Sequence, residues 1–223
     1  MSVIVLFLLL LHYVHIVTST VYTVTPDDHY YPNTTCHHCH NLQHYLLNIT
    51  KYFTSNTQLL FLPGLHHLHT HLIIQNVHNI SLIGSTANGT TLDTVIQCNS
   101  SVAIVMTNIT DLTLSDITVK NCKCDRHMNA AILIMECRNV QWTRVTVDSI
   151  SSNGIIGINV LGDSCFSYIK SHMLSINYND TQSAQNNSNH TVLIDHYIII
   201  NPSSAVFILN LEFSQYFYKV KLS

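Results

Sequence analysis

The stretch Thr110-Asp-Leu-Thr-Leu-Ser-Asp-Ile-Thr-Val119 decides the fold, because it returns 28 residues later as Arg138-Asn-Val-Gln-Trp-Thr-Arg-Val-Thr-Val147. Both copies alternate apolar and polar residues with a period of two, which is typical of a strand with one buried face and not of a helix. The same offset extends upstream, where Ile104 falls on Ile132 without any insertion. Self-similarity at a fixed spacing predicts a repeat architecture.

The repeat continues in both directions with small changes in length. At an offset of 32, Ile80 falls on Leu112 and Leu82 on Leu114. An offset of 26 carries the pattern forward and predicts these equivalent pairs: Ile132 and Ile158, Ile134 and Val160, Val140 and Phe166, and Trp142 and Tyr168. This alignment predicts an aromatic ladder of Trp142 and Tyr168 in the core, rather than a sugar-binding platform. A weaker last copy is expected at Val206 and Ile208, after a polar loop at 177–190.

Each copy holds two or three short β segments, and Asn79, Asp111 and Asn139 precede equivalent strands. Asn and Asp tolerate the left-handed backbone of tight turns. Short strands without an intervening helix predict an all-β fold, a right-handed parallel β-helix, in which each coil buries its apolar side chains against its neighbours. A leucine-rich repeat and a β-sandwich are the alternatives. The β-branched return segments, such as 145–147, disfavour the leucine-rich repeat.

An amphipathic helix is expected before the repeats, because apolar residues recur there on one helical face. These residues are Leu42, Tyr45, Leu46, Ile49, Tyr52 and Phe53. The open end of a β-helix exposes its core and unpaired strand edges. We therefore predict that this helix caps the solenoid.

The N-terminus resembles a secretory leader. The run Val3–Val17 is apolar but shorter than the ~20 residues that span a bilayer, and small residues follow at 18–20. No Lys or Arg precedes the apolar run, and an uncleaved membrane anchor is the alternative. We predict a signal peptide at 1–20, a Cys-containing segment with the capping helix at 21–57, and the β-helix at 58–223. Because the sequence stops in a strand-like segment at 219–223, we expect it to be a truncated copy of a longer protein. The predicted location is secreted, with membrane attachment only through an uncleaved leader or a missing C-terminal anchor.

Sequons and cysteines agree with secretion. N-glycosylation is predicted at Asn33, Asn48, Asn79, Asn88, Asn99, Asn108, Asn179, Asn186 and Asn189. The disulfide candidates are Cys36, Cys39, Cys98, Cys122, Cys124, Cys137 and Cys165. Adjacent coils bring equivalent positions within disulfide reach. We expect Cys98 to pair with Cys122 or Cys124, and Cys137 to pair with Cys165.

The segment from Cys36-His-His-Cys39 through Asn41-Leu42-Gln-His-Tyr45-Leu46 to Phe61-Leu-Pro-Gly64 carries a family resemblance. It resembles the opening of pectin-lyase-like right-handed β-helices, and more closely that of uncharacterised animal proteins of the cell exterior with this domain. The resemblance covers roughly residues 36–175. The resemblance implies a fold that often hosts polysaccharide lyases and hydrolases, although a fold alone does not determine an activity.

The chemistry that those enzymes need is not evident in the sequence. Hydrolysis needs paired carboxylates, and lyases use carboxylate-bound Ca²⁺ with a basic proton acceptor. The nearest candidates are Asp111, Asp116 and Asp148, with Arg144 as the base, but their positions fit turns and the solvated surface. Two Cys and three His within 36–40 have metal-ligand character, yet extracellular Cys-x-x-Cys usually oxidises. We therefore predict no catalytic residues, no metal and no cofactor.

Composition limits the partners. The 223 residues carry nine Lys and Arg and a net charge of −3, with only 9% charged residues. Nucleic-acid binding is not expected from so few scattered cations. The polar remainder is rich in hydroxyl and amide side chains. We expect a non-catalytic binding or structural module for extracellular glycans or proteins, and the alternative is a polysaccharide lyase or glycoside hydrolase.

Overall fold

The computed structural model describes the greater part of the chain in segments. These are residues 19–27, 39–85, 94–99, 102–122, 130–148, 153–160, 162–171, 173–179, 192–199, 206–212 and 219–222. The statements below concern these residues.

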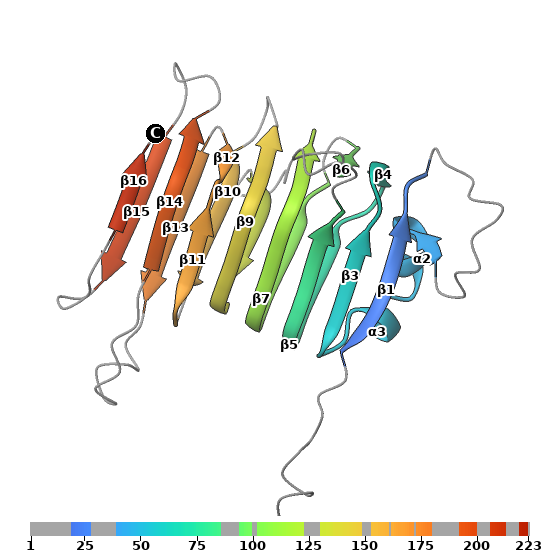
Figure 1. The fold of residues 1–223 in the computed structure, drawn as a ribbon. Helices are drawn as coiled ribbons and strands as arrows, with labels where there is room; N and C mark the ends of the chain where they lie inside the picture. The colour runs from blue at the N-terminus through green and yellow to red at the C-terminus, as the bar shows by residue number, and fades with distance from the viewer. Residues whose placement is uncertain are drawn as a thin grey trace, which may run out of the picture.

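Sixteen strands within the described residues join in one sheet network, and their pairings are parallel. The strands are β1 (Thr20–Thr25), β2 (Cys39–Asn41), β3 (Thr57–Phe61), β4 (Gly64–Leu68), β5 (Leu72–Gly84), β6 (Thr94–Cys98), β7 (Ile104–Lys120), β8 (Ala130–Met135), β9 (Arg138–Asp148), β10 (Asn153–Val160), β11 (Ser164–Ser167), β12 (Lys170–Ser171), β13 (Met173–Asn179), β14 (Val192–Ile199), β15 (Val206–Glu212) and β16 (Lys219–Leu222). Figure 1 shows β1, β3, β5, β7 and β9 side by side in chain order. The protein is therefore all-β with parallel strands, an arrangement compatible with a parallel β-helix.

The two central offsets are confirmed by the strand register. Ile80 pairs with Leu112 and Leu82 with Leu114, at the predicted offset of 32. Leu114 pairs in turn with Trp142, at the offset of 28. Strand β1 was not anticipated, and it pairs with β3 ahead of the other repeats.

The predicted offset of 26 is wrong. Trp142 pairs with Phe166, at an offset of 24, and Ile132 pairs with Ile155, at an offset of 23. A shift of two residues keeps the same side chains on the same face of a strand, so alternation alone cannot distinguish 24 from 26. Tyr168 consequently leaves the predicted core ladder and lies in the turn after β11.

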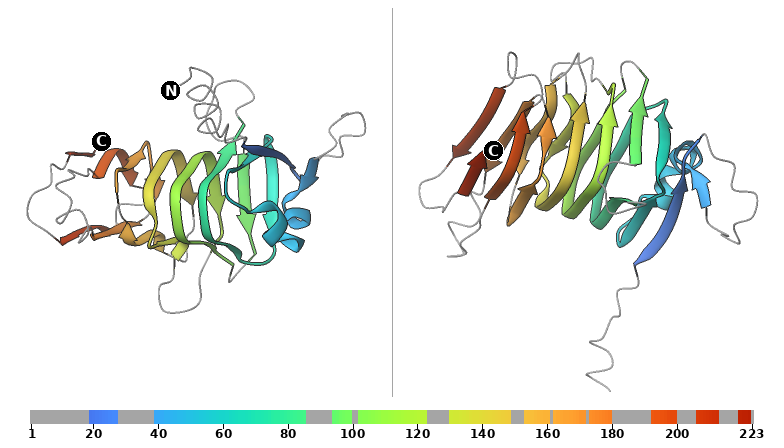
Figure 2. Two further views of the ribbon diagram at one scale, coloured as in Figure 1. Left: turned by 90° about the horizontal axis from the view of Figure 1, so that it is seen from below. Right: turned by 45° about the horizontal axis from the view of Figure 1, so that its top comes forward.

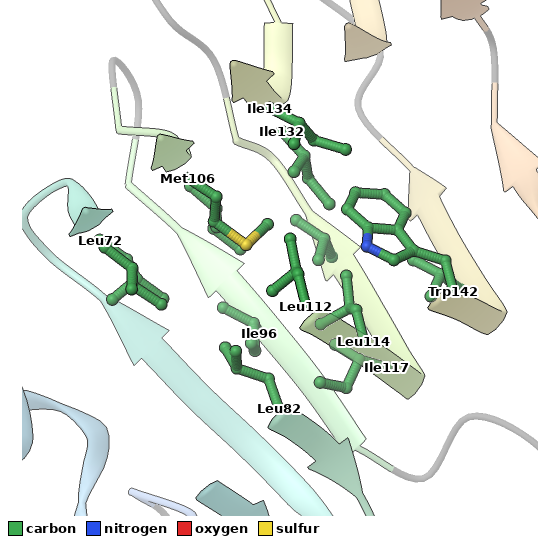
Figure 3. Packing of buried hydrophobic residues seen from close by; sticks show 14 of the residues in the cluster. Leu72, Leu82, Ile96, Met106, Leu112, Leu114, Ile117, Ile132, Ile134 and Trp142 are labelled. Carbon is green, nitrogen blue, oxygen red and sulfur yellow. The ribbon is translucent and has the colours of Figure 1, made fainter. Parts of the chain in front are cut away.

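The core forms from side chains that equivalent strands direct inward. One row of paired positions contains Leu59, Leu82, Leu114, Trp142 and Phe166, all of them buried. The rings of Trp142 and Phe166 meet edge to face, with centroids 5.7 Å apart. Figure 3 shows the apolar side chains of several strands directed toward one another, and Figure 2 shows strands on opposite sides of this interior. Burying such rows at roughly 25 cal/mol per Å² drives the association of the repeats.

Two short helices occupy the region of the predicted cap. α2 (Leu42–Leu47) begins at Asn41, whose side chain accepts a hydrogen bond from the His44 amide, and α3 (Ile49–Tyr52) follows. Leu42, Tyr45 and Tyr52 are buried, as the apolar spacing predicts. The helices lie beside β1 and β2, at the N-terminal end of the sheet (Figure 1).

Candidate functional site

Residues with positive φ recur at the turns of successive repeats and form columns. The first, here called the amide column, consists of Asn56, Asn79, Asp111 and Asn139, with φ between 52° and 59°. Each of these residues directly precedes one of the mutually paired strand positions Thr57, Ile80, Leu112 and Val140. Asn and Asp suit this conformation because their short polar side chains bond locally.

Side-chain hydrogen bonds join two pairs of neighbouring residues in the amide column. The Nδ2 of Asn79 donates to the Oδ1 of Asn56 over 3.0 Å, and the Nδ2 of Asn139 donates to the Oδ1 of Asp111 over 2.8 Å. The Oδ1 of Asn139 also accepts the backbone N–H of Asp163 over 3.2 Å. The sequence therefore places these amides correctly in turns, and the structure gives them a second role as bonds between repeats.

A second column, here called the mixed column, consists of Asp116, Arg144 and Tyr168, with φ between 52° and 58°. These residues follow Ser115, Thr143 and Ser167, which pair with one another. Arg and Tyr are poorly suited to a left-handed backbone, because a non-Gly side chain there costs roughly 1–2 kcal/mol. The mixed column therefore carries backbone strain that the amide column avoids.

Arg144 and Asp116 form a bidentate ion pair. The Nε of Arg144 lies 2.5 Å from Asp116 Oδ1, and its terminal Nη2 lies 2.8 Å from Oδ2. Hydrogen bonding to Asp116 raises the pKa of Arg144 above its ordinary value, and the nearby Tyr168 phenol adds a smaller effect in the same direction. A guanidinium held in this way cannot accept a proton at neutral pH, so Arg144 does not meet the requirement for a lyase base.

The three candidate carboxylates lie at separate places. Asp111 belongs to the amide column and accepts from Asn139, while Asp116 belongs to the mixed column and is bound by Arg144. Asp148 lies at the end of β9, where its backbone position pairs with Lys120. A pair of carboxylates poised on one bond, as glycoside hydrolysis requires, is not formed by these three residues.

Tyr168 was assigned to the core by the sequence, and the structure corrects this. The residue is 51% exposed, and its position in the register is that of Arg144. The correct spacing would have revealed it, because an offset of 24 aligns Tyr168 with Arg144, and an offset of 28 aligns Arg144 with Asp116.

The outward side chains beside the mixed column are mainly hydroxyls and amides. The surface formed by them, here called the polar face, consists of Gln58, Ser81, Thr113, Ser115, Gln141, Thr143 and Ser167. They alternate with the buried inward row, so the strand pleat directs them to the opposite side. Successive strands repeat them at the ~4.8 Å spacing of a sheet.

The disulfide predictions are corrected in part. Cys98 and Cys122 form a disulfide, with their Cα atoms 4.8 Å apart, and Cys39 is also disulfide-bonded. Cys137 is a free thiol, so the predicted bond to Cys165 is not formed. Its Sγ lies buried at the start of the turn, whereas Cys165 pairs in register with Gln141 on the outer face. Burial raises the pKa of Cys137 to about 11. Cys36 and Cys124 lie outside the described residues.

Four predicted glycosylation sites are exposed in the described residues: Asn48, Asn79, Asn99 and Asn108. Asn79 takes part in the amide column, and the Nδ2 of Asn108 donates to Asn76 over 2.8 Å. The amide of Asn99 lies 2.8 Å from His69 Nδ1. Asn179 ends β13, and four sites lie outside the described residues: Asn33, Asn88, Asn186 and Asn189.

Two further observations concern metals and membranes. In the ranges that the structure describes, no three His, Cys, Asp or Glu side chains gather as metal ligands. Within those same ranges, no helix combines the length and apolar character needed to cross a bilayer. The Cys98–Cys122 disulfide fits an extracellular location, because such bonds persist in oxidising compartments.

Comparisons with models of protein families, with curated proteins and with solved structures find no match to this chain. The class that the coordinates define is an all-β protein of parallel strands. The features of the described residues that bear on its function are the polar face and the two columns beside it.

Proposed function

We propose that this chain is a secreted, N-glycosylated right-handed parallel β-helix that acts as a non-catalytic module binding extracellular glycans. The finer fold assignment is supported by parallel pairing of segments 23–32 residues apart in the sequence and by a row of stacked apolar side chains. Capping of its N-terminal end by α2 and α3 is part of the same proposal. Secretion is supported by the apolar leader and by the disulfide at Cys98 and Cys122.

The observation that carries the binding function is the polar face. Its hydroxyl and amide groups lie on rigid neighbouring strands and repeat at a fixed spacing, which suits a partner with regularly spaced hydroxyls. Groups on strands lose little freedom when they bind, because the scaffold already orders their backbone. The low charge of the chain favours a neutral partner over nucleic acid.

The arrangement of the acidic residues weighs against the enzymatic alternative. The Asp116 carboxylate is bound to Arg144, and Asp111 is bound to Asn139. Neither can serve as a catalytic group without first losing a structural bond. A polysaccharide lyase or hydrolase would need carboxylates aimed at one glycosidic bond.

A glycan array probed with the secreted protein, with and without Ca²⁺, tests the proposal. We expect specific retention of a subset of glycans in both conditions, and intact glycans by mass spectrometry afterwards. Depolymerised product would show that the chain is an enzyme. Absence of retention across the array would refute glycan binding.

A further inference from the structure

The mixed column contains an exposed aromatic ring on a strained backbone. Tyr168 has φ 54° and is 51% exposed. Its conformation costs free energy that Gly or Asn would not cost at the same place. Strain of this kind persists where the surrounding structure imposes it, and it is frequent in binding and catalytic sites. The position therefore combines an exposed ring with a backbone conformation that its residue type does not favour.

Arg144 lies beside Tyr168 with its guanidinium fixed. Its side chain is 44% exposed, while the carboxylate side chain that it binds is 10% exposed. Two of its nitrogens contact Asp116, and the other N–H groups of the planar fork are left to donate elsewhere. The pair is neutral as a unit, so it offers directed hydrogen-bond donors without a net positive charge.

Hydroxyl groups adjoin this ring and this fork. Ser115, Thr143 and Ser167 directly precede Asp116, Arg144 and Tyr168, and they pair with one another across β7, β9 and β11. An apolar ring face, fixed donors and a row of hydroxyls thus share one edge of the polar face. Binding sites for small ligands combine apolar contact area with a few placed polar groups in this manner.

We propose that Tyr168 and Arg144, with Ser167 and Thr143, form a subsite for one neutral pyranose unit of a glycan. The C–H face of the sugar would lie on the Tyr168 ring, whose π-face is electron-rich. The free N–H groups of Arg144 would donate to sugar hydroxyls, and Ser167 and Thr143 would exchange hydrogen bonds with the neighbouring unit. This inference rests on the proposed glycan-binding function and assigns its site.

The charge at the site selects the class of sugar. Asp116 compensates Arg144 at 2.5 and 2.8 Å, so an acidic sugar gains little from this guanidinium. The chain as a whole is also negative, at −3. A neutral hexose or N-acetylhexosamine fits these charges better than a uronic or sialic acid.

The test compares variants on a printed array of neutral and acidic oligosaccharides, followed by solution titration with the neutral oligosaccharide that binds most tightly. Tyr168→Asn removes the ring and relieves the backbone strain. We expect it to weaken binding at least about tenfold while the melting temperature holds or rises. Tyr168→Phe keeps the ring and should retain most of the affinity. Arg144→Lys keeps the charge but loses the fork, and should weaken binding about fivefold.

Glu136→Asn is the matched control, because Glu136 also has positive φ, at 54°, but belongs to another turn. It should leave binding unchanged. Retention of acidic glycans alone, or wild-type affinity in both Tyr168→Asn and Arg144→Lys, would overturn the subsite and leave glycan binding intact. Failure of the wild-type protein to retain any glycan would overturn the subsite and the proposed function together.

Discussion

The amide column and the mixed column occupy two different turns of successive repeats, and they are filled in different ways. Asn56, Asn79 and Asn139 suit a left-handed backbone and bond from one repeat to the next. The mixed column ends in Arg144 and Tyr168, which do not suit that backbone and are largely exposed. In the amide column, where the turn serves the fold, the residue type agrees with the backbone. At Arg144 and Tyr168, where it does not agree, we infer that selection acted on what the side chain presents to solvent.

The largest effect is expected at Gly84, which precedes the mixed column at the position opposite Asp116. A Cβ atom at this glycine would overlap the Asp116 carbonyl oxygen, a backbone atom that cannot easily move. We expect Gly84→Ala to lower the free energy of unfolding by about 3 kcal/mol, measured by urea denaturation. Gly162→Asp is the contrasting change, because a Cβ atom there would meet side-chain atoms of Asn139 and Arg138, which can shift, and Asp tolerates the φ of 66° at this position. A loss at Gly84 no greater than at Gly162 would mean that the two repeats can separate at this turn.

The burial of the Cys137 thiol can be tested through the pH dependence of the free energy of unfolding. Burial raises the pKa of Cys137 to about 11 from its ordinary value near 9, so the folded chain holds this proton more tightly than the unfolded chain. The resulting stability is complete below about pH 9 and is lost as the pH rises toward 11. We expect a loss of about 2 kcal/mol in the free energy of unfolding across this window.

Cys137→Ala should lack this part of the pH dependence, and the difference between the two proteins isolates it from the titration of Tyr45, whose pKa burial raises to about 12. Equal pH profiles for the two proteins would show that water reaches the thiol in the folded state.

The amide column itself predicts a smaller effect. Asn139→Ala removes the hydrogen bond to Asp111, removes the acceptor for the Asp163 amide and places Ala at φ 54°. Together these changes should cost about 2 kcal/mol or slightly less. Asn139→Asp keeps the acceptor and tolerates the turn, but places two carboxylates together, so its loss should grow as the pH rises above about 4. A negligible cost for Asn139→Ala would remove the structural role of the column.

Much of this architecture follows from the sequence, and the failures lie where the spacing of the repeats changes. The offset of 28 is predicted well because β7 and β9 are long, carry distinctive residues and contain no insertion. The offset of 26 fails in two ways. Between β9 and β11 the true offset is 24, and a slip of two residues preserves the alternation. Between β8 and β10 the true offset is 23, and the similar residues Ile155, Ile156 and Ile158 of β10 do not distinguish the two. The slip of two residues places Tyr168 in the core, whereas the expected Cys137–Cys165 bond carries the offset of 28 past β9, where it no longer holds. The sequence identifies the turn residues Asn79, Asp111 and Asn139, but hydrogen bonds between turns depend on register, which composition does not encode.

The smallest expected effect is a gain, at a third set of turn residues that contains Asn76, Asn108 and Glu136. Asn108 donates to Asn76 over 2.8 Å, whereas Glu136 has positive φ without the short side chain that suits it. Glu136→Asn should extend the ladder and relieve the backbone, and thus raise the free energy of unfolding by about 0.5–1 kcal/mol. The readout is the urea midpoint at constant slope, because a changed slope would report altered compactness instead. If Glu136→Asn gains as much stability as Tyr168→Asn and leaves glycan binding unchanged, the backbone strain at Glu136 and at Tyr168 has the same origin. Only the exposed ring of Tyr168 would then have a use in binding.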